Sequence, residues 1–221
     1  MARDSAHSIS PEELLKAYAL GYFPMAQHRH DPHAMWVLPD ERGVLILAEA
    51  RAPRRLRRTI AKAPFDVRID TAFSDVIAAC AAESPGRHET WINDQIIEAY
   101  TELHALGVAH SVECYEGGAL IGGLYGVAIG GIFCGESMFS RRTDASKIAM
   151  AHLIARLKIG GFSVLDTQFF TEHLAQFGVI EIPDARYQDL LREHLGEKGD
   201  FSAAPAQLAA TTVLQSITQT S

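Results

Sequence analysis

The spacing of apolar residues predicts a helix close to the start of the chain. Ser10 is a good N-cap, Pro11 suits the first helical position, and Glu13 completes a capping box. Gly21 can end this helix in a left-handed turn. The apolar face of the helix consists of Leu14, Leu15 and Tyr18. Further on, residues 39–43 (PDERG) indicate a turn between two short strands.

The middle of the chain alternates between strand and helix patterns. Residues 65–70 alternate like a strand, and residues 71–82 follow like a helix. Residues 93–107 have the period of an amphipathic helix, which Asn93 can cap and Gly107 can end. The apolar stripe of that helix consists of Ile96, Tyr100 and Leu103.

Strand patterns dominate the next part of the chain. Residues 109–140 predict three antiparallel strands, with turns at residues 116–118 and near residues 130–131. A long helix over residues 143–161, a strand containing VLDTQ and a further helix beginning at residue 171 follow. This order of elements is α+β, and it is compatible with an acyl-CoA N-acyltransferase-like (GNAT-like) domain with a mostly antiparallel sheet.

Patterning also divides the chain into parts. A soft boundary near Pro64 separates a small N-terminal α+β domain, residues 1–63, from the main domain, residues 64–195. Residues 196–221 are small, polar and weakly patterned, so we expect a mobile C-terminal tail.

Composition limits the classes of protein that the chain can belong to. Hydrophobic residues make up 48% and charged residues 21% of the 221 residues, which is typical of a globular protein. The net charge of −7 argues against a generally nucleic-acid-binding surface, so any such binding requires a local patch. Three widely spaced cysteines, and the lack of a signal peptide or membrane-length apolar run, predict a cytoplasmic protein.

One local patch of positive charge stands out against this acidic background. Between Ala50 and Phe65 the chain has no acidic residue. The cluster consists of Arg51, Arg54, Arg55, Arg57, Arg58 and Lys62. It is either the solvated face of a helix, a lid over acidic residues, or a site for phosphate. Phosphate is a candidate because the guanidinium group of arginine pairs well with phosphate oxygens. The backbone of RNA is an obvious ligand for such a site.

Three polar residues sit in apolar surroundings. In the strand VLDTQ, Asp166 and Gln168 share one face, with Thr167 on the other. Glu136 interrupts the apolar segment IGGIFCGESMFS. Burying such groups is costly unless they have partners. The Asp–Gln pair either satisfies loop amides or handles protons, and Glu136 either pairs with Arg141 or Arg142 or serves a site.

Other motifs carry less weight. GESMF begins like the G-x-S-x-G elbow of serine hydrolases, but Phe139 replaces the second glycine. In RRTDAS, Asp144 stands where CoA-dependent acetyltransferases have a glycine that cradles a pyrophosphate. The loop HRHDPH has no helical spacing of its histidines, so we predict no metal site.

Taken together, these segments resemble the leucyl/phenylalanyl-tRNA–protein transferase family. The resemblance spans roughly residues 14–183 and is most specific from Thr90 to Ser146. One departure is the segment MWVL at residues 35–38, where the family usually has two tryptophans and a serine. The segments that carry the resemblance are LLKAYALGYFPM, LPDERGVL, TWINDQIIEAYTELHALGVAHSVE, LIGGLYGVAIGGIFCGESMFS, DASKIA and LDTQFFTEHLAQFG.

The resemblance implies a fold and an activity. The fold is a small N-terminal domain followed by an N-acyltransferase-like domain. The activity is the transfer of Leu or Phe, and less well Met, from aminoacyl-tRNA to the N-terminal Arg or Lys of a protein, which marks that protein for degradation. Because the aminoacyl ester is already activated, no cofactor and no metal are expected. The expected partners are aminoacyl-tRNA and acceptor proteins, without a membrane, and the protein is expected to be a monomer.

The resemblance also assigns roles to individual residues. Gln168 would orient the attacking amine while Asp166 polarises Gln168 or takes charge, and Glu136 would face the cationic end of the acceptor. The residues that match the family's apolar pocket are Trp91, Leu124, Phe133, Met138 and Leu165. Without the resemblance these apolar residues are ordinary core. Trp36 is the candidate for stacking on the 3′ adenosine, and the arginine cluster is the candidate for tRNA phosphates.

Two other functions remain open at this point. An acyl-CoA-dependent N-acetyltransferase would bind CoA, which Asp144 disfavours. A non-catalytic tRNA-binding module would bind tRNA without needing Asp166.

Overall fold

A seven-stranded sheet forms the centre of the protein. The computed structural model describes residues 8–83 and 89–218. Across the sheet the strand order is β4-β5-β6-β7-β8-β3-β9, and only the β7–β8 pair is parallel. The strands are β3 (Glu41–Ile46), β4 (Asp66–Ile69), β5 (Ala109–Glu116), β6 (Ala119–Ile129), β7 (Ile132–Ser140), β8 (Val164–Gln168) and β9 (Ile180–Pro183). The structure thus confirms the α+β class and the predominance of antiparallel pairing.

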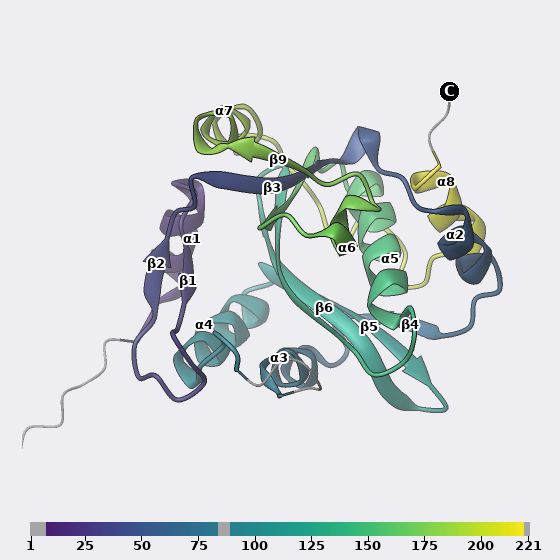
Figure 1. Ribbon diagram of the computed structural model, residues 1–221, viewed down its shortest axis with the longest axis horizontal. Coiled ribbons are helices and arrows are strands. Elements are labelled where there is room, and N and C mark those ends of the chain that lie inside the picture. The colour runs from purple at the N-terminus through teal and green to yellow at the C-terminus, as the bar shows by residue number, and fades with distance from the viewer. Residues whose placement is uncertain (1–7, 84–88, 219–221) are drawn as a thin grey trace, which may run out of the picture.

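Helices cover both faces of this sheet (Figure 1). Buried residues on one face come from α5 (Ala145–Ile159), α2 (Arg54–Ala61) and α8 (Ala210–Ser216), with the short α6 (Glu172–Ala175) beside them. Those on the other face come from α1 (Pro11–Ala19), α3 (Phe73–Ala81), α4 (Asp94–Ala105) and α7 (Asp184–His194). Strands β1 (Phe23–Met25) and β2 (Met35–Val37) form a separate two-stranded sheet, and a 3₁₀ turn, η1 (Leu47–Glu49), follows β3.

Several predicted local signals are confirmed. Ser10 and Glu13 form the capping box of α1, and the side chain of Asn93 caps α4 by accepting from the N–H of Ile96. The turns between β5, β6 and β7 use glycines with positive φ, as at Gly117 and Gly130. These elements form where the sequence predicts them because the residues that decide them are neighbours in the chain.

The segment PDERG differs from the predicted turn. Glu41, Arg42 and Gly43 belong to β3, which lies between β8 and β9 inside the central sheet. One sheet therefore runs across the predicted domain boundary at residues 63 and 64, while α1, β1 and β2 stay outside it. Pairing with two distant strands has overridden the local preference of these residues for a turn.

The end of the chain also differs from the mobile tail that the sequence predicts. Phe201, Val213 and Ile217 are buried, and α8 packs against α5 and α2. Arg156 of α5, itself buried, donates to the carbonyl oxygens of Phe201 (2.9 Å) and Ala204 (3.0 Å). A few spaced apolar residues and one arginine thus hold a segment whose sequence pattern is weak. Residues 219–221, at its end, lie outside the described part.

The two parallel strands separate within the sheet. The pairing of β7 with β8 ends at Cys134 and Asp166, although β7 continues along β6 to Ser140 and β8 continues along β3 to Gln168. On β7 the register also shifts opposite Tyr125 and Gly126, which indicates a bulge. Beyond the last pair the sheet has an opening between β7 and β8, and the candidate site lies around it.

Candidate active site

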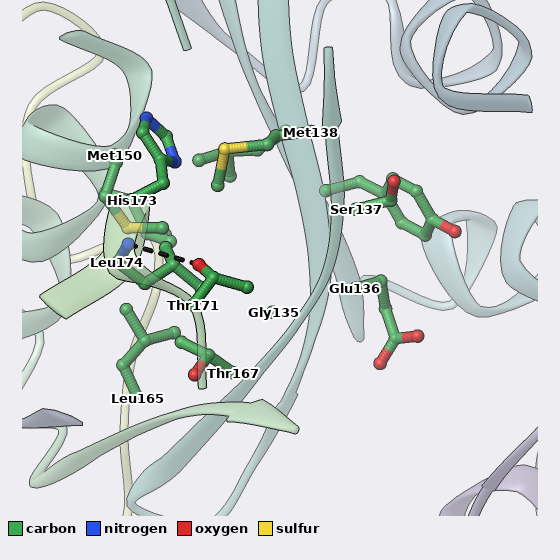
Figure 2. Close-up of a pocket in the computed structure, with 13 residues that line it drawn as sticks. Gly135, Glu136, Ser137, Met138, Met150, Leu165, Thr167, Thr171, His173 and Leu174 are labelled. Atoms are coloured by element: carbon green, nitrogen blue, oxygen red, sulfur yellow. Dashed lines mark hydrogen bonds between the residues drawn. The ribbon is translucent and has the colours of Figure 1, made fainter. Parts of the chain in front are cut away.

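A cavity of about 370 Å³ lies on the α5 and α6 side of the opening. Figure 2 shows Met138, Met150, Leu165 and Leu174 pointing into this space, with His173 at its edge. Among the residues predicted for an apolar pocket, the structure places Leu124, Met138 and Leu165 on its walls.

The remaining aromatic residues of the predicted set lie elsewhere. Phe133 is fully buried in the core and packs against Phe162 and Phe201. Trp91 is half-buried and packs against the buried cluster on the opposite face of the sheet. Trp36 lies on β2 with 43% of its surface exposed, next to Leu20 and Tyr22. The structure therefore does not bring Phe133 and Trp91, which are predicted for the apolar pocket, into the cavity, and the predicted stacking residue Trp36 lies on the surface.

Glu136 points to the opposite face of β7 from the cavity (Figure 2). Its backbone borders the cavity, but its carboxylate is buried, with 9% of the residue exposed. It accepts hydrogen bonds from the hydroxyl groups of Tyr18 (2.6 Å) and Tyr100 (3.0 Å) and from Nε2 of Gln168 (2.6 Å). The two hydroxyl groups also contact each other.

No cation within the described part of the chain pairs with Glu136. Arg141 instead donates to the carbonyl oxygen of Leu120, and Arg142 donates to Glu116. Burial raises the pKa of Glu136 to about 7, and the nearby Asp166 adds to this, while the hydrogen bonds from Tyr18, Tyr100 and Gln168 oppose it. Glu136 is therefore poised to exchange a proton close to neutral pH.

Asp166 has the opposite environment. Its carboxylate is fully buried and forms a two-pronged ion pair with Arg42, in which Nε and Nη2 lie 2.9 and 2.7 Å from its oxygens. The hydroxyl group of Tyr187 (2.7 Å) and the backbone N–H of Gln168 (2.8 Å) also donate to it. Arg42 also donates to the carbonyl oxygen of Gly21 (2.8 Å). Asp166 does not border the cavity, so these contacts suit it to hold other groups in place.

Gln168 connects these two carboxylates. Its φ of +61° is left-handed, a conformation that costs a residue with a side chain about 1–2 kcal/mol. Asp166 accepts its N–H, and its side chain reaches Glu136. Thr167 lies on the other face and lines the cavity, as strand alternation predicts. The backbone turn at Gln168 thus places its side chain so that Nε2 donates to Glu136 across the opening between β8 and β7.

Close packing supports this turn from the side of β3. A Cβ atom at Gly43 would lie 2.6 Å from the carbonyl carbon of Phe169 and 2.8 Å from the N of Phe170. The hydroxyl group of Thr167 donates to the carbonyl oxygen of Gly43 (3.0 Å). Only glycine fits here without displacing the chain that follows Gln168.

Four residues of this network have no role predicted from the sequence. Arg42 falls in the segment interpreted as a turn, and Tyr18 and Tyr100 fall on apolar helix stripes. Tyr187 lies in α7, a helix that the sequence pattern does not predict. One signal does point to a missing partner, because a carboxylate on a buried strand requires hydrogen-bond donors or a cation from elsewhere in the chain, but it does not single out Arg42.

The predicted arginine cluster forms an exposed surface on and around α2. Arg54 and Arg58 are exposed on the helix, and Leu56 and Ile60 bury its other side. Arg55 pairs with Asp144 at the start of α5 (3.1 Å), and Asp144 also lies 3.5 Å from Lys147. Burial lowers the pKa of His173 at the cavity edge, and Lys147 lowers it further. The arginine surface and the cavity therefore both adjoin the first turn of α5.

Neither a metal cluster nor a membrane helix is found where the structure describes the chain. Residues 8–83 and 89–218 contain no group of three or more His, Cys, Asp or Glu that could hold a metal ion. None of their helices is both long and apolar enough to cross a membrane.

Comparison with known proteins places this arrangement in a family. The leucyl/phenylalanyl-tRNA protein transferase model matches residues 44–192, and the model of that family's N-terminal domain matches residues 7–40. Leucyl/phenylalanyl-tRNA–protein transferases of Maricaulis maris and Phenylobacterium zucineum are 53% and 55% identical, each over 95% of this chain and 97% of the relative.

A solved structure of L-PGS from Bacillus licheniformis covers 76% of this chain and 56% of its own, at 12% identity and a TM-score of 0.37. That likeness is too low to carry an argument. The family model and the relatives extend over the strands and helices that build the site. The chain therefore belongs to the leucyl/phenylalanyl-tRNA–protein transferase family.

Proposed function

We propose that the protein transfers Leu or Phe, and less well Met, from aminoacyl-tRNA to the N-terminal Arg or Lys of acceptor proteins in the cytoplasm, marking them for degradation. One observation carries the proposal: an apolar cavity and a buried carboxylate without a cation in the described chain lie on either side of one opening in the sheet. The cavity suits an apolar side chain, and the carboxylate suits a positive chain end.

The cavity accounts for the choice of amino acid. Its walls include Met138, Met150 and Leu165, and the flexible thioether side chains can adapt to a branched or an aromatic guest. An apolar pocket discriminates by only about 1–3 kcal/mol per methylene group, so some use of Met follows.

Glu136 accounts for the choice of acceptor. Its hydrogen-bond donors within the described chain are neutral, so a cation brought by the acceptor would be its first ion-pair partner. In a buried setting such a pair favours a charged side chain over an apolar one of similar size.

The reaction requires positioning more than new reactivity. The nitrogen of the acceptor's α-amine attacks the ester carbonyl, the bond to the ribose oxygen breaks, and a proton passes from the amine to the departing ribose. Gln168 orients the amine, and Asp166 fixes Gln168 through its backbone N–H. Because the ester already supplies the driving energy, the proposal needs neither a cofactor nor a metal.

The tRNA would bind along the surface that leads to the cavity. The arginine cluster on α2 suits phosphates, and the exposed ring of Trp36 suits stacking on the 3′ adenosine. We also propose a GNAT-like fold for the part of the chain that forms the central sheet, supported by the parallel β7 and β8, which α5 connects and which separate at the site.

Transfer itself is the direct test. Purified protein is mixed with Leu-tRNA or Phe-tRNA and with matched peptides beginning with Arg, Lys, Asp or Ala, and the peptide mass is followed. We expect mass gains of one Leu or Phe residue on the Arg and Lys peptides. Equal gains on all four peptides would contradict the acceptor assignment, and no gain on any would contradict the function.

A second measurement tests the arginine surface. Replacing Arg54, Arg55, Arg57 and Arg58 with Ala should weaken tRNA binding and flatten its dependence on salt, since each phosphate contact adds about 0.7–0.9 to the slope of log K against log salt. The control variant Arg186→Ala removes one exposed arginine from α7, on the other face. An unchanged salt slope in the quadruple variant would exclude this surface.

A further inference from the structure

Two tyrosines from separate helices meet at the carboxylate of Glu136. Tyr18 comes from α1, in the N-terminal part of the chain, and donates to Oε1 (2.6 Å). Tyr100 comes from α4 and donates to Oε2 (3.0 Å). Both tyrosines are buried, and α1 and α4 pack against each other. Each carboxylate oxygen therefore has its own hydroxyl donor, supplied by helices that lie outside the sheet.

Within the described chain, none of the groups that face Glu136 is a cation that pairs with it. From β6 comes Tyr125, from β7 Cys134, and from β8 Gln168 and the anionic Asp166. Arg42 of β3 and Tyr187 of α7 are engaged with Asp166. Burial and Asp166 both favour a protonated Glu136, so neutral hydrogen-bond donors must stabilise its anion.

We propose that Tyr18 and Tyr100 are positioning residues that keep Glu136 ionised without a cation and thereby set the pH range over which a cationic acceptor is used. This inference rests on the proposed function of Glu136. The net pKa of Glu136 is about 7 because the hydrogen bonds from Tyr18 and Tyr100 offset part of the rise that burial causes. Without them the carboxyl group is protonated near neutral pH and loses its attraction for Arg or Lys.

The chain contains a matched control for this idea. Tyr125 packs edge-on against Tyr100, with ring centroids 5.6 Å apart, and its buried hydroxyl group has no hydrogen-bond partner in the described chain. Tyr125→Phe therefore removes a tyrosine hydroxyl group from the same cluster without removing a hydrogen-bond donor from Glu136.

The first measurement is a direct titration. The side-chain carboxyl carbons of glutamate are labelled with ¹³C and followed by NMR against pH, and the signal of Glu136 is assigned by its loss in Glu136→Gln. Tyr18→Phe and Tyr100→Phe should each raise the midpoint by about one to two pH units, since each removes a hydrogen bond to a charged group. Tyr125→Phe should keep the wild-type midpoint. Thermal melting checks that each variant is folded.

The second measurement is transfer to an Arg peptide as a function of pH. The α-amine of the peptide titrates identically in every assay, so differences between variants report the enzyme. In Tyr18→Phe and Tyr100→Phe the rising limb of kcat/KM should move to higher pH. A limb that moves from about pH 7 to about pH 8 lowers kcat/KM at pH 7 by about fivefold, with recovery at about pH 9. A merely structural role would lower kcat/KM equally at every pH.

The outcomes separate this inference from the proposed function. Unmoved NMR midpoints in both Tyr→Phe variants, or an equal change of midpoint in Tyr125→Phe, would overturn the positioning role. Raised midpoints in a protein that transfers no amino acid would leave that role standing and remove the proposed function instead.

Discussion

Asp166 and Glu136 are carboxylates of one buried network, and the main difference between their surroundings is a cation. Asp166 has a cation, Arg42, and Glu136 has only neutral donors in the described chain. Asp166 is held by a two-pronged ion pair with Arg42, whereas burial raises the pKa of Glu136 to about 7. Two side chains of nearly identical chemistry can therefore take different tasks: Asp166 holds the backbone, and Glu136 meets the substrate in the function proposed above.

The comparison predicts its largest effect at Arg42. Arg42→Met leaves Asp166 buried without its cation, and losing one partner of a buried ion pair typically costs about 3–5 kcal/mol. We expect a loss of this size in the free energy of unfolding at pH 7, measured with urea. The double variant Arg42→Met/Asp166→Leu should recover most of that loss but not transfer. An unfolding curve like that of the wild type for Arg42→Met would show that the pair does not hold the site together.

The next effect concerns pH and Glu136. The folded-state pKa of about 7 lies above the unfolded value of about 4.3, so the folded protein binds more protons between these values. Stability then falls as pH rises from about 4.3 to about 7, by on the order of 3 kcal/mol in all. The Glu136→Gln variant has no ionisable group at this position, so its unfolding free energy should not show this fall.

The measurement is urea unfolding of both proteins between about pH 5 and pH 8, a range that covers most of the fall expected from linkage. Other titrating groups, such as His152, are common to the two proteins and cancel in the difference. If the unfolding free energies of the two proteins changed with pH in parallel, Glu136 would not have the raised pKa that distinguishes it from an ordinary glutamate.

A smaller effect is expected from the backbone that joins the two carboxylates. In Gly43→Ala the added Cβ would meet the backbone of Phe169 at 2.6 Å, so the end of β8 must shift. We expect a loss of about 1–3 kcal/mol in unfolding free energy, which is typical of overpacking. Transfer should fall further than stability alone explains, with tRNA binding retained. Gly196→Ala, where a Cβ would have open space, is the control; equal losses in the two variants would contradict this role for Gly43.

The smallest effect is expected at Tyr187. Tyr187→Phe removes one of the donors of Asp166 but leaves Arg42 and the N–H of Gln168 in place. A loss of about 1 kcal/mol in unfolding free energy is expected. The titration midpoint of Glu136 should not move, in contrast to Tyr18→Phe. A change in that midpoint would show that the two carboxylates share one network of donors.

Local signals in the sequence predict much of this fold. The capping box at Ser10, the cap at Asn93 and the glycine turns at Gly117 and Gly130 depend on residues within a few positions of one another. The alternation of β8 likewise places Asp166 and Gln168 on one face and Thr167 on the other. Neighbouring residues decide such features, so a single sequence contains them.

The rest depends on partners that are distant in the chain. Tyr18 is 118 residues from Glu136, and Arg42 is 124 residues from Asp166. A tyrosine on an apolar helix stripe has the same pattern whether or not its hydroxyl group has a buried partner. The sequence predicts a turn at Arg42 because the residues around it favour turns. The weak pattern of the tail does not show that the tail is ordered, because Arg156, which holds it, lies in another helix.

The early separation of β7 and β8 has a consequence for inhibition. Under the function proposed above, a compound that fills only the apolar cavity beside Met138 would compete with the donor amino acid, and a guanidine that binds only Glu136 would compete with the acceptor. A bisubstrate mimic that passes through the opening between β7 and β8 would bind the cavity and Glu136 at the same time. The linker length that gives the highest affinity would measure the distance between donor and acceptor at the moment of peptide-bond formation.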